Sequence, residues 1–107
     1  MRLSDAIRRG CGMYPVQAFG IMFSLHEDGA CAWGAAVGVM GVVETWPAPL
    51  ASFSLSDAKC PEHCHAAERD SHIPLKNIIF HLNDDHHWTR EAIADWVESI
   101  EMQRRMR

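Results

Sequence analysis

Side chains that bind metals gather in residues 60–87, which hold two of the four cysteines and six of the seven histidines. Three residues separate Cys60 from Cys64, four separate His81 from His86, and sixteen lie between the two pairs. Thiolates and imidazoles are strong ligands for soft and borderline metal ions, and paired spacings of this kind let one ion bridge two segments. The spacing therefore predicts a metal site made of Cys60, Cys64, His81 and His86.

These two pairs resemble the ligands of a two-cysteine, two-histidine zinc finger, and Pro61 suits a tight turn between the cysteines. The resemblance implies a structural zinc ion in a closed tetrahedron. The spacer is longer than the roughly 12 residues of DNA-reading fingers. A histidine pair five positions apart does not share one face of a straight helix, so we expect the helix to unwind near Asn83. The likeness covers about a quarter of the chain and concerns a site rather than a fold.

The same segment leaves alternatives open. It also contains spare histidines, any of which could replace a proposed ligand, with His65 and His72 as the first substitutes: His63, His65, His72 and His87. A reduced cluster without metal, or a redox or disulfide role for Cys60 and Cys64, would also suit this composition.

The sequence contains no assembled set of catalytic residues and no motif for an organic cofactor. Glu62, Asp84 and Asp85 could serve a zinc-bound water as bases, but the HExxH motif of metalloproteases is absent. GACAWG bears a slight likeness to the cysteine region of papain-like proteases, and the start of a helix would lower the pKa of Cys31. A small buried thiol explains Cys31 better, and Cys11 is expected to be a core or loop thiol. We predict a non-enzymatic protein, with a cysteine or zinc hydrolase as an alternative.

Length and charge limit the remaining possibilities. At 107 residues the chain is expected to be a single domain, 1–107, with an N-terminal half at 1–46 and a metal knuckle with a helix pair at 58–107. The net charge of −4 disfavours nucleic acid as a partner, so another protein is the expected partner. No apolar run reaches the roughly 20 residues of a membrane span, and a cytoplasmic location is expected.

The N-terminal half mixes helical and strand patterns. Ser4 can cap a short helix that Gly10 ends. Residues 19–25 alternate in the manner of a strand, and Asp28-Gly29 supplies a hairpin turn. Residues 31–41 form a helix of small side chains ending at Gly41. Residues 42–59 contain Pro47 and Pro49 and have no sustained period, which favours a loop with one short strand.

The last third predicts two helices. Pro74 suits a first helical position, and an apolar stripe follows at i, i+3, i+4 and i+7: Leu75, Ile78, Ile79 and Leu82. Asn83, Asp84 and Asp85 favour a break. Thr89 can cap a second helix, whose stripe contains Ile93, Trp96, Val97 and Ile100.

Two further resemblances concern longer segments. TREAIADWV resembles the first helix of a helix-turn-helix motif, but no turn and reading helix follow it. The order LSDAIRRG, CAWGAA, the cysteine pair and HLNDDHHWTREAIADWVE resembles a set of small uncharacterised bacterial and bacteriophage proteins. That likeness implies a prokaryotic or phage accessory protein and supplies no catalytic residues.

Together these patterns predict a small, mostly helical α+β domain with a short β-hairpin and a zinc-knuckle-like loop leading into a C-terminal helix pair. The expected function is a zinc-stabilised module for protein interaction. A nucleic-acid-associated regulator that uses zinc as a scaffold and the C-terminal arginines as contacts is the other binding function that the sequence allows.

Overall fold

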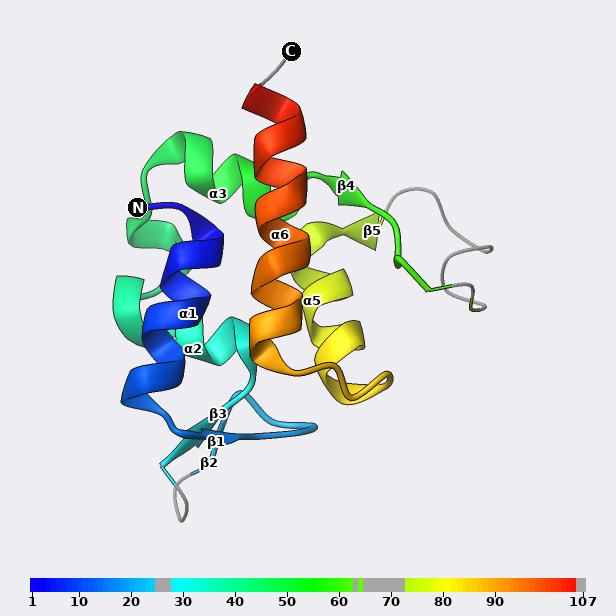
Figure 1. The fold of residues 1–107 in the computed structure, drawn as a ribbon. Helices are drawn as coiled ribbons and strands as arrows, with labels where there is room; N and C mark the ends of the chain where they lie inside the picture. Colours follow the sequence, from blue (N-terminus) through cyan, green and yellow to red (C-terminus); the bar gives the residue numbers. More distant parts are fainter. Residues whose placement is uncertain (25–27, 63, 65–72, 106–107) are drawn as a thin grey trace.

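A computed structural model of the chain describes residues 1–24, 28–62, 64 and 73–105. Helices predominate in it, which confirms the predicted α+β class (Figure 1). The elements in chain order are α1 (Leu3–Met13), β1 (Val16–Gln17), β2 (Phe23–Ser24), β3 (Gly29–Ala30), α2 (Ala32–Met40), the 3₁₀ helix η1 (Val43–Thr45), α3 (Ala48–Leu55), β4 (Asp57–Ala58), β5 (Ile73–Pro74), α5 (Leu75–Asp84) and α6 (Arg90–Arg105).

The helices surround one core, and α6 lies between α1 and α5 (Figure 1). The predicted stripe of α5 is fully buried, and Ile93 and Val97 of α6 are buried beside it. Trp96 and Ile100 are partly buried against the same core. The Oγ1 of Thr89 accepts a hydrogen bond from the backbone N–H of Ala92 at 3.1 Å, which confirms the predicted cap of the second helix.

Two small sheets complete the fold. In the first, β3 lies in the centre, antiparallel to β2 and parallel to β1, so the predicted hairpin is confirmed, although Gly29 lies in β3 and not in the turn. The strand predicted over residues 19–25 was too long, because only Phe23 and Ser24 pair in the described part of it. Gly20 has a φ of 76°, and its N–H bonds Asp84 rather than a neighbouring strand. In the second sheet, β4 pairs antiparallel with β5 and leads towards Cys60.

Two predicted helix signals proved wrong at the N-terminus. The first helix begins at Leu3, so Ser4 lies within its first turn and is buried instead of capping it. The carboxylate of Glu101 accepts a hydrogen bond from the N–H of Leu3 at 3.1 Å. This bond satisfies one of the backbone N–H groups at the start of α1 that have no partner within the helix. Gly10 does not end the helix but lies inside it, where α1 approaches α2 at Ala35.

The loop predicted over residues 42–59 was wrong, because this region contains η1 and α3, but the one short strand predicted there is present as β4. Both prolines fit the start of α3: Pro47 is its N-cap residue and Pro49 lies in its first turn. The first N–H groups of a helix have no partner within the helix, so a proline there loses no hydrogen bond. The two prolines therefore mark the beginning of a helix and do not indicate a loop.

Two buried polar residues tie the C-terminal helices to the N-terminal half. The side-chain oxygen of Asn83 accepts hydrogen bonds from Gln17 and from the N–H of Ala32, and its amide donates to the carbonyl of Ala18. The guanidinium of Arg90 donates to the carbonyls of Tyr14, Pro15 and Ala30. Asn83 thus fixes the end of α5, and Arg90 fixes the start of α6.

Among the described residues, no helix combines the length and apolar character that crossing a membrane requires.

The close approach of α1 and α2 can be tested at two glycines of one helix. A Cβ at Gly10 would overlap the backbone carbonyl of Ala35, whereas a Cβ at Gly12 meets nothing within 4 Å. We expect Gly10→Ala to lower the free energy of unfolding by about 1–3 kcal/mol. The matched control Gly12→Ala should leave it unchanged or raise it by up to about 1 kcal/mol. Urea unfolding measures both, and equal stability of the two variants would contradict this packing.

Candidate metal centre

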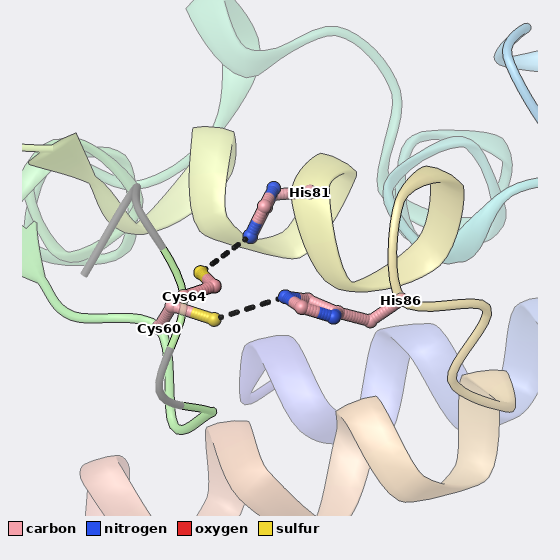
Figure 2. A group of neighbouring side chains, drawn as sticks. All are labelled: Cys60, Cys64, His81 and His86. Atoms are coloured by element: carbon pink, nitrogen blue, oxygen red, sulfur yellow. Dashed lines mark hydrogen bonds between the residues drawn. The ribbon is translucent and has the colours of Figure 1, made fainter.

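The four side chains predicted as ligands meet in one place (Figure 2). Cys60 and Cys64 come from the segment after β4, His81 comes from the last turns of α5, and His86 follows the end of that helix. One ligand atom from each residue lies within 4.8 Å of the other three. The group could hold a metal ion, and it is the one such group among the described residues.

The spacing of the ligand atoms suits tetrahedral coordination. The Sγ of Cys60 lies 3.5 Å from the Nε2 of His86, and the Sγ of Cys64 lies 3.4 Å from the Nε2 of His81. A metal at about 2.3 Å from sulfur and about 2.0–2.1 Å from nitrogen places those two atoms about 3.6 Å apart in a tetrahedron. Both sulfur–nitrogen distances are therefore close to the edge of a coordination tetrahedron.

The end of α5 brings together two histidines that a straight helix would separate. The helix ends at Asp84, and the carbonyl of His81 accepts hydrogen bonds from the N–H of Asp85 at 2.9 Å and of His86 at 3.3 Å. The bond from His86 spans five residues instead of the four of a regular α-helix, and this wider turn returns His86 towards His81. The two rings meet nearly edge to face at 4.5 Å. The predicted break is thus confirmed, although Asn83 itself remains helical.

Each imidazole is held from behind by a carboxylate. The Nδ1 of His81 lies 2.7 Å from Asp85, and the Nδ1 of His86 lies 2.8 Å from Glu62. Metal-bound histidines commonly donate their second N–H to a carboxylate, which fixes the tautomer and the orientation of the ring. Both Nε2 atoms point towards the sulfurs (Figure 2). The two imidazoles are therefore oriented for coordination through Nε2.

Glu62 extends this arrangement to the segment that leads into α6, because its second oxygen accepts a hydrogen bond from the indole N–H of Trp88 at 2.6 Å. Sequence reasoning considered Glu62 and Asp85 only as bases for a metal-bound water, and it missed their contacts with the histidines. The spacing of His81 and Asp85, four positions apart in and just after a helix, was the available signal. Nothing in the sequence marks the contact of Trp88 with Glu62, which are 26 residues apart.

Burial affects the protonation of the ligands. Cys60 is buried, and this burial raises the pKa of its thiol. Burial also opposes the charged form of His81, but the hydrogen bonds with Cys64 and Asp85 more than offset it and raise the pKa of His81. In the metal-free protein both groups therefore keep a proton to higher pH than they would in water.

The remaining candidates lie apart from this cluster or outside the described residues. His63, His65 and His72 belong to the residues that the structure does not describe. His87 is exposed, and its ring stacks on Phe19 at 4.9 Å.

The two other cysteines have local surroundings that disfavour reactivity. Cys31 is buried at the N-cap of α2, where its sulfur accepts a hydrogen bond from the N–H of Gly34 at 3.3 Å. Burial raises the pKa of Cys31, so the lower pKa expected from the helix start was wrong. Burial also raises the pKa of the half-buried Cys11. A protonated thiol is a poor nucleophile, which matches the interpretation of Cys31 as a buried structural residue.

Comparisons with protein-family models, with curated proteins and with solved structures give no match for this chain.

The carboxylates behind the histidines should strengthen metal binding. We expect Glu62→Gln and Asp85→Asn each to weaken metal affinity about 10–100-fold, because each replaces the charged acceptor behind an imidazole with a neutral amide, which accepts a weaker hydrogen bond. Competition with a coloured chelator measures the affinity. Glu91→Gln is the matched control, since it removes one exposed carboxylate from the first turn of α6. An effect of the control as large as that of Glu62→Gln would show that overall charge, not orientation, sets the affinity.

Metal affinity should also depend on pH. Because the pKa values of Cys60 and His81 are raised, protons compete with the metal at neutral pH, and binding must displace them. Affinity should rise with pH by about tenfold per pH unit for each proton released. Chelator competition between about pH 6 and pH 8 measures the slope. An affinity that does not change over this range would contradict coordination by these two residues.

Proposed function

We propose that this protein is a small non-enzymatic binding module whose fold is stabilised by one structural zinc ion. The ligands are Cys60, Cys64, His81 and His86. The observation that carries the proposal is the convergence of four ligand atoms within 4.8 Å of one another, with each imidazole held by a carboxylate. Four protein ligands complete a tetrahedron and leave no position for substrate or water.

The ligand types favour zinc over other common metals. Two thiolates and two imidazoles in a tetrahedron are typical of structural zinc, whereas magnesium and calcium take oxygen ligands in larger shells. The two nearby carboxylates contact imidazole Nδ1 atoms, so they support the ligands instead of joining them. This arrangement favours a metal that needs no oxygen ligand.

The position of the cluster supports a stabilising role. The metal would connect the turn after β4 to the end of α5, two segments that are joined along the chain by residues 65–80. A chain of 107 residues has a modest core, and metal binding contributes directly to the folding of such small domains. Zinc would therefore add to the stability that the modest core provides.

Features of the surface and of the thiols support binding rather than catalysis. Cys31, the candidate nucleophile, is buried with a raised pKa. The net charge is −4, and the guanidinium of Arg104 donates to Ser56 and lies over the ring of Phe53. Because a net negative charge disfavours binding to phosphate backbones, another protein is the favoured partner.

The order of motifs along the chain favours an accessory protein of prokaryotic or phage origin.

Removing the metal or one of its ligands tests the proposal. Metal analysis of the purified protein should give one zinc per chain, and a strong chelator should lower the melting temperature. Cys60→Ser and His81→Ala should each lose the zinc and most of the folded population, because a structural zinc site contributes several kcal/mol to folding.

Cys11→Ser is the control for these variants, since Cys11 is a thiol outside the cluster. It should keep both the metal and the fold. Metal-free wild-type protein that unfolds at the same temperature with and without added zinc would contradict the proposal.

A further inference from the structure

One face of the molecule carries an apolar hollow of about 380 Å³ between α2, η1, α3 and α5. Trp33 and Val37 of α2 line it, together with Met22, Val42 and Leu55. Val42 is 56% exposed and Leu55 is 57% exposed, so two large apolar side chains stand in solvent beside the hollow. Ligand pockets span roughly 300–1,000 Å³, so this hollow has room for one or two side chains of a partner rather than for a large ligand.

At the end of α3 a polar side chain is buried and an apolar side chain is exposed, which is the reverse of the usual arrangement. Ser54 is fully buried, while the next residue, Leu55, is exposed. The buried Ser54 hydroxyl is satisfied within the helix, since it donates to the carbonyl of Ala51 at 2.7 Å. Water disfavours an exposed leucine at the rim of an apolar hollow, so this side chain gains most from being covered by a partner.

The charges that line the hollow are opposite in sign and come from different elements. Glu44 lies in η1 and Lys76 lies in the first turn of α5. Within the described part of the chain, neither residue takes part in an ion pair, although the Nζ of Lys76 lies 6.0 Å from the centre of the Trp33 ring. A face with one acid and one base matches a second copy of itself when a two-fold axis runs midway between the two side chains, because that axis sets each charge opposite its counterpart.

We infer that this face pairs two copies of the chain. In the pair, Leu55 and Val42 of each copy fill the hollow of the other, and Glu44 of each copy lies opposite Lys76 of the other. The inference rests on the proposed function, since it identifies the partner of a non-enzymatic binding module as a second copy of the same chain. The metal centre and the paired face use different residues, so the two can be tested separately.

Analytical ultracentrifugation of the full chain with zinc present, over a wide range of protein concentration, tests the pairing. Wild-type protein should form a dimer. Leu55→Glu should raise the dimer dissociation constant at least about tenfold, because it places a charge in the apolar contact. Met13→Glu is the matched control, since Met13 is 55% exposed and does not line the hollow. It should dimerise as the wild type does.

Exchange of the two charges tests the geometry. Glu44→Lys should weaken the dimer, because it sets a second positive charge against Lys76 across the two-fold axis, and adding Lys76→Glu should restore it. A monomeric wild type would overturn the inference, whether a different protein or only water covers the hollow. A dimer weakened equally by Leu55→Glu and Met13→Glu would also overturn it, and circular dichroism verifies that each variant is folded.

Zinc analysis of the same samples separates this inference from the proposed function. A monomer that holds one zinc and unfolds on chelation overturns the pairing and leaves the structural metal intact. A dimer that holds no zinc overturns the structural metal and supports the pairing.

Discussion

The geometry of the candidate metal centre depends on how α5 ends. If the helix continued past Asp84, His86 would lie on a different face from His81, and the two imidazoles could not meet the same pair of sulfurs. The carbonyl of His81 accepts two N–H groups at this end, and Asn83 anchors it to the N-terminal half. The helix end therefore decides whether four ligands converge or only three.

Several other features support the same helix end. Glu62 joins His86 to Trp88, so one carboxylate connects the cysteine turn, the end of α5 and the segment that leads into α6. Arg90, at the start of α6, is held by carbonyls of residues 14, 15 and 30. Polar side chains thus fix the arrangement of segments around the cluster, while the apolar stripes of α5 and α6 provide the core beneath them. Zinc at the cluster would secure the side of α5 that faces the cysteine turn.

The sequence was most informative where the pattern is local. The stripe from Leu75 to Leu82, the cap at Thr89 and the end of the first helix at Asp84 all depend on residues a few positions apart, and the structure has each of them. The ligand pairs were also visible, because cysteine and histidine are uncommon and their spacing is short within each pair. Local chemistry therefore predicted the four residues that the fold brings together.

Long-range contacts explain what the sequence did not predict. Ser4 looks like a helix cap, but Glu101 satisfies the first donor of α1 from almost a hundred residues away. Gly10 looks like a helix stop, but it is the point where α1 lies against Ala35. Two prolines suggested a loop where they begin α3. In the first two cases a contact with a distant segment overrides a strong local preference, whereas the prolines follow a local rule, since the first turn of a helix accepts proline.

X-ray absorption spectroscopy of the purified protein at the zinc edge is the most direct test of the metal centre. Coordination by Cys60, Cys64, His81 and His86 predicts one zinc per chain with two sulfur neighbours at about 2.3 Å and two nitrogen neighbours at about 2.0–2.1 Å. A folded protein without bound metal, or a shell in which oxygen replaces one of these four ligands, would contradict a closed structural site.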